Sequence, residues 1–282
     1  MPKLRIMSTN VWRCAENKPW WIERGLDCSS AARAPGIAKA YLETRPDIIG
    51  TQECDVIFRN RLPLEIANLG LNYSFIEAGF TSVLYNNDTL ELVEWEYVVY
   101  PENIPNYEGV FNNDDSKSFC LAVFRAKEDG KYIVFAGTHL WWMSGDEGRG
   151  CYRPHSHEAR KYQMNTMIDH LEKFRQKYNC PAVAVGDINA TYNSLAIRAA
   201  LGRGYFHAHD IAVEYSDERN GWHYCFPDGY VGYDDPKPFE EGIDHILIAG
   251  APEGFVKRFE RYTPEYYLPL SDHFPVFADV DL

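Results

Sequence analysis

The sequence has 282 residues, 45% of them hydrophobic, which is enough to bury the core of one large domain. Its 28 basic and 41 acidic residues give a formal charge of −13, which repels polyanions and disfavours long duplex DNA as a partner. The seven scattered cysteines form no C-x-x-C pair, so a disulfide framework and a zinc knuckle are both disfavoured.

Strand-like and helical runs alternate along the chain, without a repeat or a linker that would divide it into domains. Short apolar runs predict strands, and longer runs with an apolar residue every three or four positions predict helices. In chain order, we expect strand 4–11, helix 31–44, strand 47–51, helix 56–68, strands 73–77, 82–85, 90–100, 119–125 and 132–138, helix 158–178, strand 181–185, a helix from the Ser194 cap to Leu201, and strands 243–249, 255–262 and 274–280.

The mixture of hairpins and crossovers predicts an α/β fold in which two sheets pack together and helices cover the outside. Pro63 lacks a backbone N–H and is expected to interrupt or kink its helix. The segments 13–30, 141–157 and 213–241 are long for loops of a compact domain, which is typical of functional loops.

Polar clusters interrupt the apolar strand runs at six places. Four follow the carboxyl end of a predicted strand, and two stand where a strand begins. Each alone also fits a turn or a solvated strand end, so the prediction depends on their co-occurrence and order. The clusters contain Asn10, Gln52-Glu53, Thr138-His139, Gly186-Asp187-Ile188-Asn189, Asp244-His245 and Ser271-Asp272-His273-Phe274-Pro275.

This ordered set resembles the endonuclease/exonuclease/phosphatase superfamily, the DNase I-like hydrolases. The resemblance extends from Asn10 to Val276, nearly the whole chain. It implies a single domain over 1–282 with a four-layer α/β/β/α sandwich, in which two mixed β-sheets pack face to face between helices. It also implies a metal-dependent phosphoesterase that uses Mg²⁺ or Mn²⁺.

Within this resemblance, Glu53 is the best candidate metal ligand, with Asn10 and Asp272 as its partners. A phosphate ester is anionic, and a hard cation on oxygen ligands would neutralise its charge. Mg²⁺ usually keeps several waters, so few protein ligands suffice. The number of metals stays open.

The catalytic candidates are His273 to activate water or bind a phosphate oxygen, Asp244 to orient His273, and His139 to stabilise the charge that builds on the phosphate. Asp187 would orient the water or protonate the leaving oxygen, and Asn189 would hold the phosphate. Which residue is the general base stays open. The family often supports the first histidine with a carboxylate, for which Glu77 is the nearest candidate. We interpret His245 as a packing or supporting residue.

The long loops supply the predicted substrate-binding residues Trp141, Trp142, Arg149, Arg153 and Trp222. A tryptophan ring there can stack on a base, a sugar ring or an acyl chain. The arginines, with His155 and His157, would bind a second phosphate. A zinc site of Cys151, His155 and His157 is disfavoured because no fourth ligand has suitable spacing.

The leading hypothesis is a cytoplasmic phosphodiesterase that cleaves a small or single-stranded nucleotide-type or phospho-sugar substrate. A phosphomonoesterase on the same scaffold is the alternative. A glycosidase with Glu53 and Asp187 as its two carboxylates would leave both histidines without a role. A non-catalytic binding protein would not need the complete set. The oligomeric state stays open.

Overall fold

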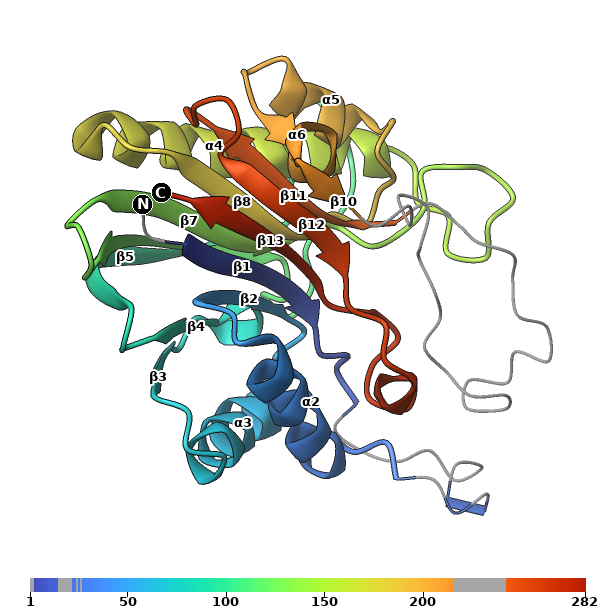
Figure 1. Cartoon of the computed structure of the whole chain (residues 1–282). Coiled ribbons are helices and arrows are strands. Elements are labelled where there is room, and N and C mark those ends of the chain that lie inside the picture. Colours follow the sequence, from blue (N-terminus) through green and yellow to red (C-terminus); the bar gives the residue numbers. More distant parts are fainter. Residues whose placement is uncertain (1–2, 15–21, 24, 26, 216–241) are drawn as a thin grey trace.

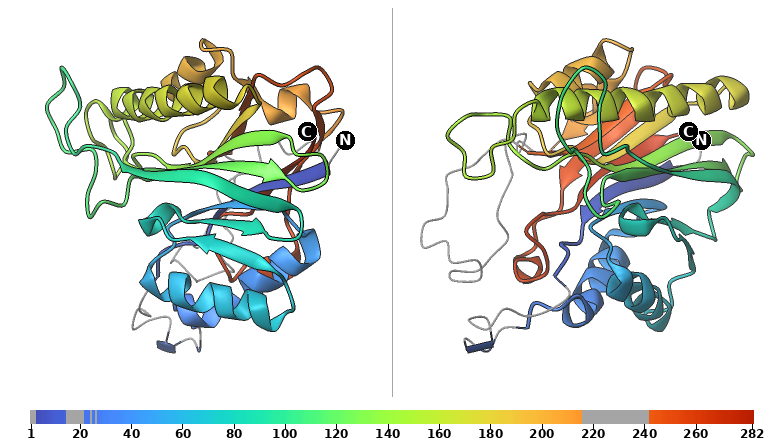
Figure 2. Two further views of the ribbon diagram at one scale, coloured as in Figure 1. Left: turned by 90° about the vertical axis from the view of Figure 1, so that its left-hand side faces the viewer. Right: turned by 180° about the vertical axis from the view of Figure 1, so that it is seen from behind.

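The computed structural model describes residues 3–14, 22–23, 25, 27–215 and 242–282 (Figure 1). Within these residues, two mixed β-sheets pack face to face, and helices cover the outer face of each (Figure 2). The first sheet has the strand order β10-β12-β13-β1-β2-β4-β3, and the second has β5-β6-β7-β8-β11-β9. The predicted DNase I-like α/β sandwich is confirmed.

The first sheet comprises β1 (Lys3–Asn10), β2 (Ile48–Gln52), β3 (Tyr73–Ile76), β4 (Val83–Asn86), β10 (Glu214–Tyr215), β12 (Val256–Arg261) and β13 (Val276–Asp281). The second comprises β5 (Leu90–Val99), β6 (Ser118–Ala126), β7 (Tyr132–His139), β8 (Ala182–Asp187), β9 (Phe206–His207) and β11 (Asp244–Ala249). The helices are α2 (Ser30–Thr44), α3 (Val56–Asn68), α4 (Ser156–Tyr178), α5 (Leu195–Leu201) and α6 (Ala208–Ile211), with 3₁₀ turns at Gly79–Thr81 and Glu265–Tyr267.

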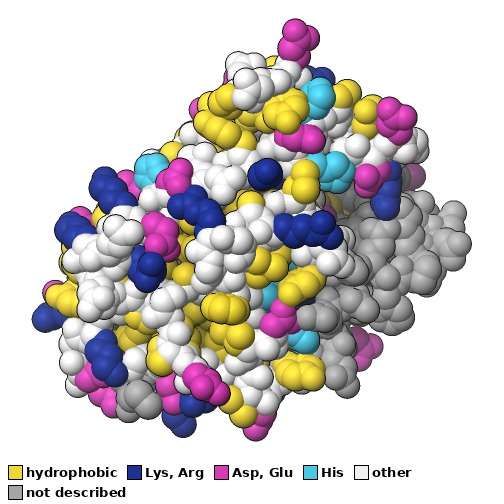
Figure 3. Space-filling model, turned by 90° about the horizontal axis from the view of Figure 1, so that it is seen from above, with side chains coloured by type: hydrophobic (Ala, Val, Ile, Leu, Met, Phe, Trp, Pro, Cys, Tyr) yellow, Lys and Arg dark blue, Asp and Glu magenta, His cyan; other side chains and the backbone are white. Residues whose placement is uncertain are grey.

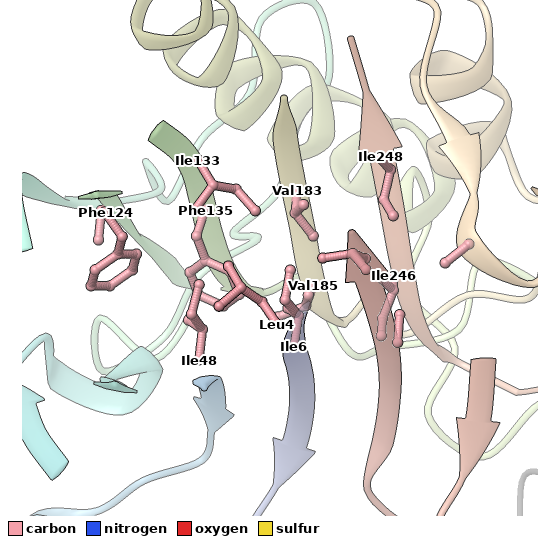
Figure 4. Packing of buried hydrophobic residues seen from close by; sticks show 14 of the residues in the cluster. Leu4, Ile6, Ile48, Phe124, Ile133, Phe135, Val183, Val185, Ile246 and Ile248 are labelled. Carbon is pink, nitrogen blue, oxygen red and sulfur yellow. The ribbon is translucent and has the colours of Figure 1, made fainter. Parts of the chain in front are cut away.

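The main core lies between the two sheets, where Ile6, Ile48, Phe135, Val185 and Ile246 interdigitate (Figure 4). All five are fully buried, and such burial contributes roughly 1.5–3 kcal/mol per large aliphatic or aromatic side chain. Side chains alternate across a strand, so the residues between them face the helices instead. Two further cores form there, one under α4 and α5 and the other under α2 and α3.

The two sheets approach each other closely at Gly50 and Gly137. A Cβ atom on Gly50 would lie 2.7 Å from Val185 Cγ2 and 3.2 Å from the Cα of Gly137. Any side chain at either position would push the sheets apart. The two glycines precede the polar clusters of β2 and β7, so this close approach brings the two clusters together.

Strand pairing gathers the polar clusters at one edge of the sandwich. In the parallel pair β1–β2, Asn10 lies beside Gln52, and in the parallel pair β7–β8, His139 lies beside Asp187. The antiparallel strand β11 begins with Asp244 opposite Asp187. Carboxyl ends of parallel strands share an edge, so residues far apart in the sequence become neighbours.

Most predicted elements are present within one or two residues of their expected bounds. The expected interruption at Pro63 was wrong, because α3 continues through it from its Asp55 cap to Asn68. The short elements β9, α6 and β10 were not predicted, since two to four residues carry no detectable periodicity. Among the helices of the described residues, none combines the length and the apolar character that a membrane span requires.

Candidate active site

A cleft of about 960 Å³ opens where the polar clusters meet. Six of the predicted metal and catalytic residues line it. The two others lie directly behind the lining, where Asn10 contacts Asp187 and Asp244 contacts His273. The six lining residues are Glu53, His139, Asp187, Asn189, Asp272 and His273.

Asp187 is the centre of this arrangement. Its Oδ2 accepts a hydrogen bond from Asn10 Nδ2 at 3.0 Å and lies 3.4 Å from His139 Nε2 and 3.8 Å from His273 Nε2. Its Oδ1 accepts the backbone N–H of Asn189 at 2.8 Å. Burial raises the pKa of Asp187 to about 7, although the positive charge of His273 acts to lower it. Near neutral pH, this carboxyl group is therefore ready to take up or release a proton.

His273 and Asp244 form the predicted buried pair, with 2.7 Å between Nδ1 and Oδ2. Burial opposes the charge of the imidazolium, but the carboxylates of Asp244, Asp272 and Asp187 hold the pKa of His273 well above its usual value. Burial acts to raise the pKa of Asp244, but the charge and the hydrogen bond of His273 lower it below its usual value. The pair is therefore an imidazolium–carboxylate pair at neutral pH.

His139 has a basic partner that the sequence did not reveal. Lys117 Nζ lies 2.7 Å from His139 Nε2, and both side chains are buried. Burial lowers the pKa of Lys117 to about 8, while Glu53 and Asp187 oppose this shift. Burial and the charge of Lys117 hold the pKa of His139 well below its usual value. The candidate supporting carboxylate, Glu77, is instead exposed on the surface.

Glu77 forms an ion pair with Arg59 at 3.0 Å, at a side-chain exposure of 69%. It therefore does not support His139. Lys117 directly precedes the apolar run of β6, whose first residue, Ser118, pairs with His139 in the sheet. That pairing, rather than any local motif, brings the lysine into the site.

The acidic groups of the site fit a divalent cation. Ligand atoms of Glu53, His139 and Asp187 lie within 4.8 Å of one another. Asp272 Oδ1 is buried and has no hydrogen-bond partner among the described residues. Burial, with the nearby charge of Glu53, raises the pKa of Asp272 to about 6. A cation would compensate these crowded carboxylates, and oxygen donors suit Mg²⁺ or Mn²⁺.

The individual ligands differ in suitability. His139 is the weakest candidate because its Nε2 contacts the Lys117 ammonium group. Asn10 Oδ1 accepts the backbone N–H of Trp12 at 2.9 Å, and its amide nitrogen faces Asp187, so metal ligation by Asn10 stays a prediction. Glu53 has a left-handed backbone with φ of 57°, which is unfavourable for a residue other than glycine and typical of functional sites.

The predicted substrate-binding residues lie in different environments. Trp142 is 46% exposed and lines the cleft, as does Arg149. Trp141 is only 4% exposed and donates from Nε1 to Ser156 Oγ, so it belongs to the core and its expected contact with substrate is corrected. Arg153 is not part of the cleft lining. Trp222 lies outside the described residues.

Two further basic residues line the cleft without having been predicted, Arg13 and Arg160. Arg13 packs over the ring of Phe80 at 4.8 Å. Arg160 is buried and donates to the carbonyl groups of Trp141 and Met143 and to His157 Nδ1. Arg160 therefore fixes the loop that follows β7 against the first turns of α4.

The disfavoured zinc site is not formed by the described residues. His155 packs against Tyr107 at 4.8 Å between ring centroids, and His157 contacts Asp146 and Arg160. Cys151 belongs to no cluster with the two histidines that could hold a metal within the described part of the chain.

Comparisons with known proteins agree with this architecture. The model of the Endonuclease/Exonuclease/phosphatase family matches residues 7–273. Nothing matched in the comparison with curated proteins. An endonuclease/exonuclease/phosphatase from Bacteroides vulgatus has a similar structure, with a TM-score of 0.75, 20% identity and full coverage of both chains.

Two other similar structures have more specific names. A mannosyl-6-phosphatase from Bacteroides thetaiotaomicron has a TM-score of 0.72 and 21% identity, over 99% of this chain and 100% of its own. D. rerio TDP2 in complex with a single-strand DNA product has a TM-score of 0.63 and 15% identity, over 99% of each chain. The family match over nearly the whole chain, together with the shared fold, shows that this protein belongs to the Endonuclease/Exonuclease/phosphatase family.

Proposed function

We propose that this protein hydrolyses a phosphate ester with the help of a divalent cation held by Glu53 and Asp272, beside Asp187. The observation that carries the proposal is the convergence of three buried or half-buried carboxylates and two imidazoles on one cleft. When bound, such a cation neutralises charge on the phosphate. The remaining chemistry falls to side chains of this chain.

In the proposed reaction, a water oxygen attacks phosphorus, and the bond from phosphorus to the ester oxygen breaks. The ester oxygen leaves with the electron pair of that bond and takes up a proton from solvent to give the alcohol. Asp187 orients the water and takes its proton, which suits a carboxylate at the centre of the cleft, beside both imidazoles. His273, held as an imidazolium by Asp244, donates a hydrogen bond to a phosphate oxygen. Asn189 and Lys117 add donors at the cleft wall.

Lys117 supports a monoester rather than a diester. A phosphate monoester carries about −1.5 to −2 charges at pH 7, whereas a diester carries one. The buried ammonium group supplies an extra positive charge deep in the site, beside His139. The mannosyl-6-phosphatase with a similar structure provides a precedent for monoester cleavage on this fold.

The cleft wall suits a polyhydroxylated substrate such as a phospho-sugar. Neutral amide and hydroxyl side chains can bond sugar hydroxyls, and the exposed ring of Trp142 can stack on the apolar face of a sugar. The neutral polar lining includes Asn113, Ser116, Ser144, Thr191, Asn193 and Ser194.

A phosphodiesterase is the second candidate, because a cleft of about 960 Å³ has room for groups on both sides of the phosphate. D. rerio TDP2, crystallised with a single-strand DNA product, has the same fold. Long duplex DNA is disfavoured by the formal charge of −13. On the face shown in Figure 3, Lys and Arg side chains are scattered among acidic ones rather than gathered in one basic patch.

Two chromogenic esters test the proposal. With Mn²⁺ or Mg²⁺, we expect p-nitrophenyl phosphate to be cleaved with a kcat/KM at least about tenfold above that of bis(p-nitrophenyl) phosphate. EDTA should abolish both activities. Activity on a glycoside that survives chelation would support the two-carboxylate glycosidase, and a folded protein inactive on a broad ester panel would support a binding protein.

A further inference from the structure

Two buried histidines lie at the edge of the second sheet where β9 pairs with β11, close to Asp244. Strand β11 alternates its side chains, so Asp244 faces the catalytic cleft region while the next residue, His245, faces the other way. There His245 meets His207 of β9. The side chains are 4% and 6% exposed. Neither belongs to the catalytic set described above.

Hydrogen bonding fixes the protonation of both rings. His245 Nε2 lies 2.8 Å from the carbonyl oxygen of Ala190, which only accepts, so Nε2 carries the proton. In the neutral ring, Nδ1 then accepts from His207 Nε2 at 3.0 Å. His207 Nδ1 in turn accepts the backbone N–H of His209 at 3.2 Å. The chain of bonds is satisfied with both rings neutral, and burial lowers the pKa of His245 to about 4.

Ala190, at the end of this chain of hydrogen bonds, directly follows a residue with a left-handed backbone. Asn189 has a φ of 51°, a conformation that asparagine adopts more readily than most residues other than glycine. Its N–H bonds Asp187 Oδ1, and its side chain donates to the carbonyl oxygen of Leu140 at 3.1 Å. These two contacts hold Asn189 in place, and the hydrogen bond from His245 holds the next residue, Ala190.

We propose that His245 and His207 are positioning residues, which hold the Ala190 carbonyl group so that Asn189 and Asp187 keep their places at the phosphate. The inference rests on the proposed function of the cleft. The two histidines act through Ala190 and do not touch the substrate. His245 is central because its two ring nitrogens connect His207 to the catalytic segment.

Two amide variants distinguish the loss of the hydrogen bond to Ala190 from a change in packing at position 245. In His245→Gln, the side-chain nitrogen can reach the position of Nε2 and keep the bond to Ala190. In His245→Asn, the amide reaches only the position of Nδ1, so that bond is lost. Leu247→Met is the matched control, since Leu247 is buried on the same outer face of β11 and the change conserves volume.

Turnover of p-nitrophenyl phosphate with Mn²⁺ should fall about tenfold or more in His245→Asn, mainly in kcat, because misplaced catalytic groups slow the chemical step. His245→Gln and Leu247→Met should stay within about threefold of the wild type. Equal losses in the Gln and Asn variants would overturn the inference, since the bond to Ala190 would not be the cause.

Hydrogen exchange supplies a second readout that needs no activity. Amides of the segment 187–191 should exchange faster in His245→Asn than in the wild type and in His245→Gln, because the segment opens more often. Unchanged exchange in His245→Asn would overturn the inference even if the enzyme is active. A wild type that is inactive on phosphate esters, with the expected exchange pattern, would overturn the proposed function and leave the positioning role supported.

Discussion

The ammonium group of Lys117 lies 2.7 Å from His139 Nε2, and the lysine side chain is enclosed by the acidic site. A buried lysine is costly unless charges of opposite sign surround it. Here burial lowers the pKa of Lys117 to about 8, and the negative charges of Glu53 and Asp187 limit this shift because they favour the charged form. The lysine lines the cleft and therefore places a positive charge in its wall.

Replacing this charge should affect monoesters most. Lys117→Met keeps the approximate volume of the side chain, and we expect kcat/KM for p-nitrophenyl phosphate to fall about 10- to 100-fold, as for the loss of one charge-assisted hydrogen bond. Activity on bis(p-nitrophenyl) phosphate should fall less. Lys161→Met, at an exposed position of α4, is the control. An equal loss on both esters would contradict the role of Lys117 in selecting the monoester.

The central carboxylate and its imidazolium neighbour should both be essential. Asp187→Asn and His273→Ala should each lower kcat by at least about two orders of magnitude, as is typical when a proton-transfer group or a charge-stabilising donor is lost. Asp169→Asn, on the exposed side of α4, should leave kcat unchanged. Unfolding temperatures measured alongside will show whether the variants are folded. Full activity in both Asp187→Asn and His273→Ala would rule out the mechanism.

These two residues were predictable from the sequence, whereas Lys117 was not. Asp187 and His273 stand in polar clusters at strand ends, and the order of those clusters resembles a known family. Lys117 has no such motif, and it reaches the site because β6 pairs with β7 so that Ser118 lies beside His139. A single sequence does not specify that register. The same limit applies to His207, which meets His245 through the short pairing of β9 with β11.

Metal binding should depend on Glu53 and can be measured without substrate. Glu53→Gln removes a charged oxygen ligand, and we expect the affinity for Mn²⁺, measured by calorimetry, to fall about tenfold or more. Asp272→Asn should have a similar effect. Glu77→Gln is a matched control, because this exposed glutamate pairs with Arg59 on the surface. Unchanged Mn²⁺ affinity in both site variants would exclude them as the ligands.

The buried histidine pair predicts acid sensitivity of the fold. The pKa of His245 is lowered to about 4 by burial, whereas an unfolded histidine has a pKa of about 6.5. Below pH 6.5, the unfolded state therefore binds a proton that the folded state does not, so stability is full above that pH and falls as the pH drops towards 4. The loss should be of the order of 1–3 kcal/mol.

This contribution can be isolated by a variant. His245→Gln does not titrate, so its free energy of unfolding should fall less than that of the wild type when the pH is lowered from 7 to 4.5. Urea titrations at several pH values measure the difference. His170→Gln is the control, because His170 is only partly buried, contacts Glu96 and does not line the cleft. Parallel pH curves for wild type and His245→Gln would show that His245 does not cause the acid sensitivity.

Substitution of Trp141 should affect the stability of the fold, whereas substitution of the neighbouring Trp142 should affect substrate binding. Trp141 packs edge-on against Phe111 at 6.0 Å and is 4% exposed, so Trp141→Ala should lower the free energy of unfolding by about 3–5 kcal/mol. Trp142 is 46% exposed at the cleft, so Trp142→Ala should change stability by no more than about 0.5 kcal/mol.

For a phospho-sugar, Trp142→Ala should raise KM about tenfold with little change in kcat, since stacking contributes to binding in the ground and transition states alike. For p-nitrophenyl phosphate, which has no sugar ring, KM should change less. Steady-state kinetics on both substrates, with urea unfolding of both variants, make the comparison. A KM effect of equal size on the two substrates would show that Trp142 shapes the cleft entrance generally rather than stacking on a sugar.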